Sequence, residues 1–137
     1  MRISVWSMVL AAALLLASCG GGDDGSAAAG IRIVSPAVAA AILDDAPADL
    51  VVLDVRTVEE FDAGHLDGAE MLDFYRADFA DRLAELDPTA PYVIYCRSGN
   101  RSGQTRAIME DLGFTDVVDV EGGVLAWDAA GLPLTTP

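Results

Sequence analysis

Three short runs of mostly apolar residues most constrain how this chain can fold. They span residues 50–55, 92–95 and 117–120, and a polar segment follows each of them. A run that is apolar toward both faces is typical of a strand in a sheet that is covered on two sides. Because helix-like segments lie between these runs, their order predicts an α/β fold with a central parallel sheet flanked by helices on both faces.

Local signals mark where the helices begin and end. Ser35 followed by Pro36 is typical of a helix start, and so is Thr57 with Glu60 three residues later. Gly113 is expected to end a helix that begins at residue 102. The expected helices are 36–43, a short one after Thr57, 77–86 and 102–112, with further strands at 31–34 and 71–72.

The first 30 residues differ from the rest of the chain. Arg2 precedes an apolar run that closes with Leu-Ala-Ser-Cys at Cys19. A positive start and a short apolar run with small residues at its end are typical of a secretory signal, and the ending resembles a bacterial lipoprotein signal. We therefore expect residues 1–18 to be a lipoprotein signal peptide. Residues 19–30 are expected to form a flexible tether that starts at a lipidated Cys19, and 31–137 the folded domain.

The charge of the chain limits its partners. It has 22 acidic residues, eight arginines and a formal net charge of −14. Such a surface repels nucleic acid and anionic lipid headgroups. We therefore expect no nucleic-acid partner. A membrane contact is expected only through the lipid, on the extracytoplasmic side, which is the periplasm or the outer surface.

The stretch Tyr-Cys-Arg-Ser-Gly-Asn-Arg-Ser-Gly, residues 95–103, places Cys96 directly after a predicted strand. Ligands of open parallel sheets bind outside the carboxyl ends of strands. If Cys19 is lipidated, Cys96 has no cysteine with which to form an internal disulfide, and two cysteines do not form a zinc site. The alternative is a buried structural thiol, but the polar, turn-forming neighbours favour a reactive one.

Three features of this loop favour the thiolate, which is the nucleophilic form of cysteine. Backbone N–H groups of the loop and of the next helix can point toward the sulfur, and Gly99 lets these amides converge. Arg97 and Arg101 add positive charge. We expect the pKa of Cys96 to fall from about 8.5 into a range of roughly 3.5–7.5. No histidine is required, and the single His65 is expected to order a turn.

The loop resembles the active loop of rhodanese-like sulfurtransferases. Other landmarks of that family follow in the same order, and the resemblance covers nearly all of residues 31–134. Asp67 departs from the pattern, since the family usually has proline there. The matching segments are residues 53–57 with 59–61 (LDVRT, EEF), 64–69 (GHLDGA), 96–102 (CRSGNRS) and 121–127 (EGGVLAW).

The resemblance implies a sulfurtransferase that works in two covalent steps. Cys96 would take the outer sulfur of a small anionic donor such as thiosulfate, and cyanide or a thiol would then accept it from the persulfide. No cofactor and no metal is implied. The loop amides would hold the added sulfur, and the arginines would attract the donor. The implied substrate-binding residues are Arg97, Ser98, Gly99, Asn100, Arg101 and Ser102.

Asp54 and Arg56 are expected to support the site and not to react. Glu59 and Glu60 stand three and four positions after Arg56, a spacing suited to a local ion pair. Asp54 can accept hydrogen bonds from nearby amides at its strand end. Arg106 is not expected to face the same way as Arg101.

Two other functions remain open. A domain with this loop can bind or carry sulfur for an exported partner without turnover of its own. A thiol phosphatase or an arsenate-reductase-like enzyme is the second alternative, and related phosphatases use the pattern Cys-x5-Arg. Here four residues separate Cys96 from Arg101, and one residue fewer shortens the chain by up to about 3.3–3.6 Å. The shorter loop favours one sulfur atom over a phosphoryl group.

Overall fold

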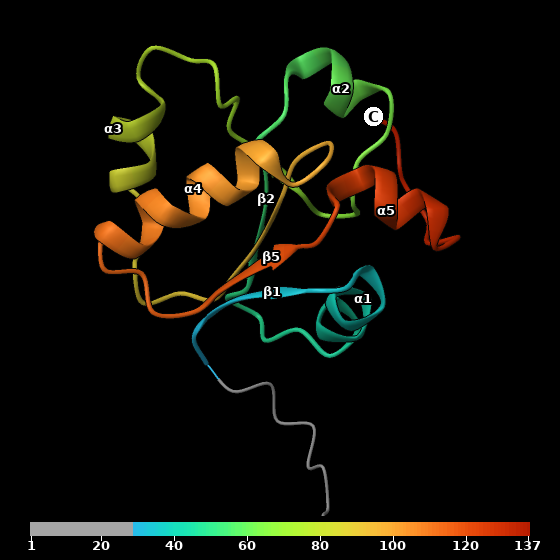
Figure 1. Ribbon diagram of the computed structural model, residues 1–137, viewed down its shortest axis with the longest axis horizontal. Coiled ribbons are helices and arrows are strands. Elements are labelled where there is room, and N and C mark those ends of the chain that lie inside the picture. The colour runs from blue at the N-terminus through green and yellow to red at the C-terminus, as the bar shows by residue number, and fades with distance from the viewer. Residues whose placement is uncertain (1–28) are drawn as a thin grey trace, which may run out of the picture.

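The computed structural model describes residues 29–137, which form a five-stranded sheet covered by helices (Figure 1). All neighbouring strands pair in parallel, in the order β1-β5-β4-β2-β3. The predicted parallel α/β fold is confirmed. The strands are β1 (Ile31–Val34), β2 (Val51–Asp54), β3 (Glu70–Met71), β4 (Tyr92–Tyr95) and β5 (Val117–Val120).

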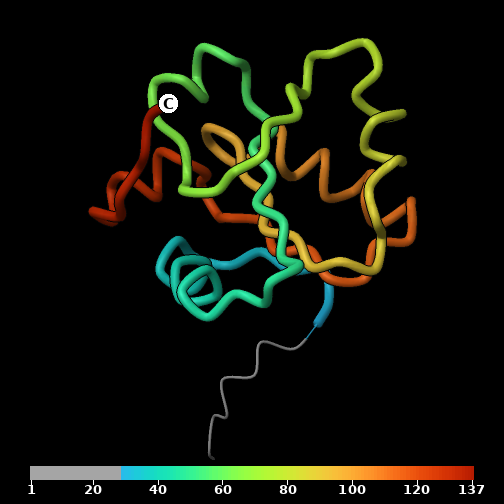
Figure 2. Tube along the Cα trace, turned by 180° about the vertical axis from the view of Figure 1, so that it is seen from behind, coloured from blue at the N-terminus to red at the C-terminus, as the bar shows by residue number. Residues whose placement is uncertain are grey.

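The helices lie on both faces of the sheet. α3 and α4 pack on one face, and α1 and α5 pack together on the other (Figures 1 and 2). α4 begins two residues earlier than predicted, because Gly99 adopts a left-handed φ of 97° and turns the chain directly into the helix. The helices are α1 (Pro36–Asp44), α2 (Val58–Asp62), α3 (Phe79–Ala84), α4 (Asn100–Asp111) and α5 (Gly123–Ala129).

The predicted helix starts are formed as the sequence indicates. The Ser35 side chain accepts a hydrogen bond from the backbone N–H of Val38. Thr57 and Glu60 form a reciprocal capping box at the start of α2. Each cap supplies acceptors for N–H groups that have no partner inside the helix.

Alternation along the strands separates the core into two clusters. In β4, Ile94 belongs to the cluster beneath α3 and α4, whereas Val93 and Tyr95 belong to the cluster beneath α1 and α5. Cys96 follows Tyr95 and lies on the α3/α4 side. Trp127 of α5 is buried in the second cluster, as predicted for a core anchor.

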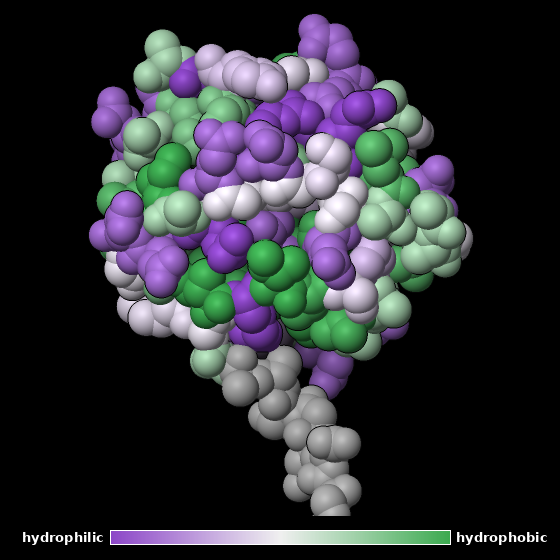
Figure 3. All heavy atoms as spheres, viewed as in Figure 1, coloured by the Kyte–Doolittle hydropathy of each residue, from purple (hydrophilic) through white to green (hydrophobic). Residues whose placement is uncertain are grey.

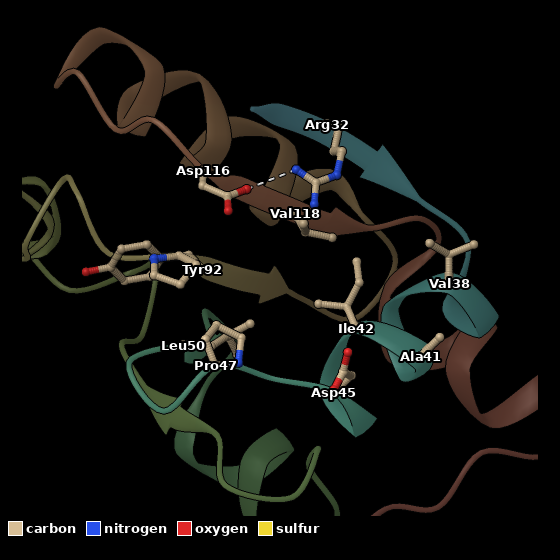
Figure 4. Close-up of a pocket in the computed structure, with 11 residues that line it drawn as sticks. Arg32, Val38, Ala41, Ile42, Asp45, Pro47, Leu50, Tyr92, Asp116 and Val118 are labelled. Atoms are coloured by element: carbon tan, nitrogen blue, oxygen red, sulfur yellow. Dashed lines mark hydrogen bonds and ion pairs between the residues drawn. The ribbon is translucent and has the colours of Figure 1, made fainter. Parts of the chain in front are cut away.

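The two ends of the sheet differ in character. A cavity of about 510 Å³ lies at the amino ends of the strands, beside Leu50, Tyr92 and Asp116 (Figure 4). Cys96 lies at the opposite, carboxyl end of β4 and does not line this cavity. In the view of Figure 3, a group of hydrophobic residues lies over the lower centre of the molecule, near β1, with hydrophilic residues among and above them.

The expected signal peptide and Cys19 lie outside the described residues, as does the tether apart from residues 29 and 30. The carbonyl of Gly30 accepts a hydrogen bond from Val117 N–H at 3.1 Å, so the chain is attached to β5 at this point. Within residues 29–137, no helix is both long and apolar enough to cross a membrane.

Candidate active site

Cys96 is the first residue after β4, and its side chain lies at the base of the loop that leads into α4. The residue is only 1% exposed. The Gly99 N–H donates a hydrogen bond to the sulfur at 3.1 Å. The thiol is therefore deeper than its polar sequence neighbours suggest, and a backbone amide faces it.

Hydrogen bonding lowers the pKa of Cys96 in spite of its burial. Burial is the largest influence and by itself would raise the pKa of the thiol. The Ser102 side chain and the backbone N–H groups of Ser102, Ser98 and Gly99 act in the opposite direction and outweigh it. The direction agrees with the predicted amide cradle, and the dominant stabilising groups are neutral donors of the loop.

The first turn of α5 holds this loop in shape. Val124 N–H donates to the carbonyl of Cys96 at 2.9 Å, and Leu125 N–H donates to the carbonyl of Arg97 at 3.1 Å. Because these two carbonyl oxygens accept hydrogen bonds from α5, they do not occupy the space around the sulfur. A Cβ on Gly123 would overlap the carbonyl of Cys96, and Gly123 also has a left-handed φ of 59°. Only glycine fits at this position.

Arg97 and Arg101 have different environments. The Arg97 side chain is exposed, and within residues 29–137 no ion pair involves it. Arg101 makes two hydrogen bonds of 2.8 Å with the Glu60 carboxylate, and its guanidinium stacks over the ring of Tyr75 at 5.5 Å. The hydrogen bond from Arg101 lowers the pKa of Glu60 to about 2. One of the two expected donor-attracting charges is thus already neutralised within the protein.

Asp54 and Arg56 form a buried ion pair beside the loop. The Asp54 carboxylate accepts hydrogen bonds from the Arg56 backbone N–H and from its guanidinium, with Nη2 to Oδ2 at 2.6 Å. Arg56 also donates to the carbonyl of Gly64 at 2.8 Å. Burial would lower the pKa of the guanidinium, but Asp54 outweighs it and raises the pKa. The pair joins β2 to the turn that follows α2.

The predicted ion pair of Arg56 with Glu59 or Glu60 is wrong. Arg56 lies before α2 and turns back toward Asp54, while the capping box directs Glu60 to Thr57 and Arg101. The helical spacing rule does not apply, because Arg56 is not part of the helix.

The remaining loop residues divide between the surface and the interior. Ser98 and Asn100 are exposed, and the Asn100 side chain accepts a hydrogen bond from Gln104 at 2.9 Å. Ser102 is fully buried in the first turn of α4. Both serines lower the pKa of Cys96, although Ser102 Oγ makes no hydrogen bond within residues 29–137.

Sequence reasoning missed Asp119 altogether. This residue of β5 is buried, and Arg106 contacts it with Nε to Oδ2 at 3.3 Å. Arg106 and Arg101 pair with different carboxylates, Asp119 and Glu60, which agrees with the prediction that they do not face the same way. The only sequence signal was a lone carboxylate within an otherwise apolar strand.

His65 orders the turn after α2, as predicted. Its ring stacks on Phe61 with centroids 3.7 Å apart, and Nδ1 lies 2.9 Å from the Phe61 carbonyl. The His65 backbone also pairs with Thr135, which attaches the C-terminal segment to this turn.

The fold and the cysteine loop define the class of protein. The rhodanese-like domain family matches residues 35–130, and the chain belongs to this family. The structure also resembles the crystal structure of a rhodanese-related protein from Thermoplasma volcanium, with a TM-score of 0.67 and 25% identity. That match covers 77% of this chain and 99% of the other.

Two curated relatives narrow the comparison to sulfurtransferases. Thiosulfate sulfurtransferase GlpE of Pseudomonas putida is 44% identical over 80 residues, which are 58% of this chain and 70% of that protein. Probable adenylyltransferase/sulfurtransferase MoeZ of Mycobacterium tuberculosis is 35% identical over 83 residues. That match covers 61% of this chain but only 21% of MoeZ, so the chain corresponds to about a fifth of that relative. Together they support a sulfurtransferase-like enzyme.

Proposed function

We propose that this protein transfers a sulfane sulfur from a small anionic donor such as thiosulfate to a thiophilic acceptor, through a persulfide on Cys96. The observation that most supports this proposal is the convergence of loop donors on one sulfur atom. The Gly99 N–H lies 3.1 Å from it, and the donors together lower its pKa. A thiolate at neutral pH is the nucleophile that the reaction needs.

The two steps balance in atoms and charge. In the first, the Cys96 thiolate attacks the outer sulfur of thiosulfate, a new S–S bond forms, and sulfite leaves with the electron pair of the broken S–S bond. In the second, cyanide or an acceptor thiolate attacks the terminal sulfur of the persulfide and releases the Cys96 thiolate. Sulfur is negatively charged before and after each step, which suits a site made of N–H donors.

One observation favours a sulfur carrier that serves a partner protein. Because Glu60 neutralises Arg101, Arg97 is the loop arginine left to attract a free anion. An exposed Arg97 at the rim is equally suited to an acidic group on a protein surface. A carrier would form the persulfide but would turn over slowly with small donors and acceptors alone.

Intact mass spectrometry after thiosulfate treatment tests the persulfide. We expect the mass to rise by one sulfur atom, the gain to disappear on adding cyanide, and Cys96→Ser to show no gain. Ser98→Ala is the matched control, since Ser98 contributes its backbone N–H and its side chain is exposed. No mass gain with any sulfane donor would refute the proposal.

Steady-state assays separate the alternatives. Thiocyanate formation from thiosulfate and cyanide, lost in Cys96→Ser, supports independent turnover. A persulfide without thiocyanate turnover supports the carrier. Hydrolysis of an aryl phosphate at a comparable rate would support a phosphatase, which the short loop between Cys96 and Arg101 disfavours.

We also propose that Cys19 is lipidated and holds the domain at the extracytoplasmic side of a membrane. The proposal depends on the Leu-Ala-Ser-Cys ending of the apolar run and on the glycines that follow it. Metabolic labelling with a fatty acid is expected to mark the wild-type chain. If Cys19→Ser is labelled equally, or if the wild type stays in the soluble fraction, the proposal is wrong.

A further inference from the structure

The two arginines that follow Cys96 differ in how their charges are paired. Within residues 29–137, every arginine except Arg97 lies within ion-pair distance of a carboxylate. Arg97 is exposed, whereas Arg101 pairs with Glu60. An anion that approaches Cys96 therefore meets one positive side chain whose charge is not already paired.

Glu60 reaches Arg101 because α2 begins at the same edge of the sheet as the cysteine loop. The Val55 N–H donates to the carbonyl of Tyr95 at 3.1 Å, so the chain that leads into α2 runs beside the residue before Cys96. Glu60 lies in the first turn of α2, three residues after the cap. In Figure 1, α2 and the start of α4 both lie in the upper part of the view.

The Glu60 carboxylate is held firmly against Arg101. Each of its oxygens accepts a hydrogen bond of 2.8 Å from the guanidinium, and Oε2 also accepts one of 3.2 Å from the Thr57 N–H. The ring of Tyr75 covers the guanidinium, which leaves the Arg101 side chain 12% exposed. Arg101 can turn toward a donor only by breaking two charge-assisted hydrogen bonds, and such bonds are the strong ones.

We propose that Glu60 is a specificity-determining residue, which makes the site favour singly charged sulfane donors over doubly charged ones such as thiosulfate. The favoured class includes the anions of organic thiosulfonates. This inference rests on the proposed sulfur transfer through Cys96. Without Glu60 the site would offer the charges of both Arg97 and Arg101, which would suit a doubly charged donor, but with Glu60 only Arg97 is left.

Two further charges act in the same direction. The attacking thiolate of Cys96 is negative, and the whole chain has a formal net charge of −14. Both repel a second negative charge on the donor more than the first alone. Glu60 itself stays ionised at neutral pH, since the hydrogen bond from Arg101 lowers its pKa to about 2.

The chemical step is the same for both classes of donor. The Cys96 thiolate attacks the outer sulfur, a new S–S bond forms, and the leaving group departs with the electron pair of the broken S–S bond. Thiosulfate releases sulfite, and a thiosulfonate releases a sulfinate. Charge is conserved in each case, so the two donors differ at this site in the charge that must approach the thiolate.

Rates of persulfide formation with thiosulfate and methanethiosulfonate test the preference. Intact mass spectrometry gives the rate constant on Cys96 for each donor. We expect Glu60→Gln to raise the ratio of the thiosulfate constant to the methanethiosulfonate constant about two- to fivefold, because one negative charge is removed from the rim. The amide oxygen of the new side chain can still accept from Thr57. An unchanged ratio would overturn the inference.

Glu59→Gln is the matched control. Glu59 stands beside Glu60 in α2, is exposed, and pairs with no arginine of residues 29–137. Its substitution removes the same charge from the protein but leaves Arg101 paired. We expect the wild-type ratio, and a rise as large as that of Glu60→Gln would mean that net charge alone decides the preference.

Alkylation of Cys96 tests the charge preference without any sulfur transfer. Iodoacetate is negative and iodoacetamide is neutral, and each forms a thioether with the thiolate and releases iodide. We expect the ratio of the iodoacetate constant to the iodoacetamide constant to rise about two- to fivefold in Glu60→Gln and to stay at the wild-type value in Glu59→Gln. A shift in the pKa of Cys96 cancels in this ratio. No rise in Glu60→Gln would overturn the inference.

The two measurements distinguish a failure of this inference from a failure of sulfur transfer. If the alkylation ratio rises as expected but no sulfane donor adds sulfur to Cys96, the effect of Glu60 on anions is supported and sulfur transfer is wrong. If the persulfide forms but neither ratio changes in Glu60→Gln, sulfur transfer is supported and the role of Glu60 is wrong.

Discussion

Two buried aspartates lie on the strands that flank β4, and their surroundings differ. Asp54 of β2 is fully buried and accepts hydrogen bonds from the backbone and the guanidinium of Arg56. Asp119 of β5 is also buried, but it receives one contact of 3.3 Å from Arg106, and its Oδ1 has no hydrogen-bond partner among residues 29–137. An aspartate is thus well paired on one side of β4, and another is poorly paired on the other side.

The comparison indicates which charge supports the fold and which is poorly paired. A carboxylate that is fully paired fixes its neighbours, as Asp54 fixes Arg56 and through it Gly64. Burial raises the pKa of Asp119, whose Oδ1 accepts no hydrogen bond among residues 29–137.

The largest expected difference is in stability. Asp54→Ala leaves the Arg56 charge buried without its partner, which is expected to lower the free energy of unfolding by about 3–5 kcal/mol. Asp119→Ala removes a poorly paired buried charge, and we expect a loss below about 1 kcal/mol. Urea denaturation of both variants measures the difference. Equal losses would show that the two aspartates have the same role.

Substitutions of the two arginine partners should differ in their cost to stability in the same order, with Arg56 above Arg106. Arg56→Lys loses the planar guanidinium whose Nε and Nη2 both donate to Asp54, and we expect it to cost about 1–3 kcal/mol. Arg106 is partly exposed and makes a single contact, so Arg106→Lys should cost no more than about 0.5 kcal/mol. Thermal unfolding of the two matched substitutions provides the test. A larger loss for Arg106→Lys would contradict the assigned roles.

The pH dependence of stability should identify Asp119. Its pKa is raised in the folded protein, so its contribution to stability is fully present below the unfolded pKa and is lost as the pH rises through the folded pKa. Asp119→Asn does not lose this stability. Its free energy of unfolding should therefore increase relative to that of the wild type as the pH rises. Unfolding free energies across the acidic to neutral range measure this gain. A difference that does not change with pH would contradict the raised pKa.

The smallest effect concerns Glu60, a partly exposed carboxylate whose pKa is lowered to about 2. Here the sign is reversed: the stabilisation is present above the ordinary pKa of the group and is lost as the pH falls toward 2. We expect Glu60→Gln to cost less than about 1 kcal/mol at neutral pH and to weaken the acid dependence of unfolding. If the variant unfolds in acid with the wild-type profile, the ion pair with Arg101 contributes nothing measurable.

Much of the fold could be predicted because the signals are local. Mostly apolar runs predicted β2, β4 and β5, and the caps at Ser35 and Thr57 predicted the starts of two helices. The loop from Cys96 to Ser102 could also be recognised, since its amides and its cysteine are neighbours in the chain. Gly99 turns the chain within this segment, although α4 begins two residues earlier than expected.

The missed features are contacts between distant parts of the chain. Glu60 and Arg101 are 41 residues apart, and spacing alone assigned Glu60 to the wrong arginine. The close approach of Gly123 to Cys96 joins the turn after β5 to the turn after β4. Spacing along the chain does not predict such pairs, because strand order and register decide which side chains meet.

The amino-acid sequence by itself therefore determined the α/β class, the place of Cys96 directly after a buried strand and the amide-rich loop around it, since each depends on residues close together in the chain. The tertiary structure decided which charges are paired, that α5 holds the loop carbonyls, and that Asp119 is buried with one oxygen unpaired among residues 29–137. The physical reason is that burial and hydrogen-bond partners are properties of the packed sheet. The hydrogen-bond partners of a carboxylate in an apolar strand are known only when the positions of the neighbouring strand and helix are known.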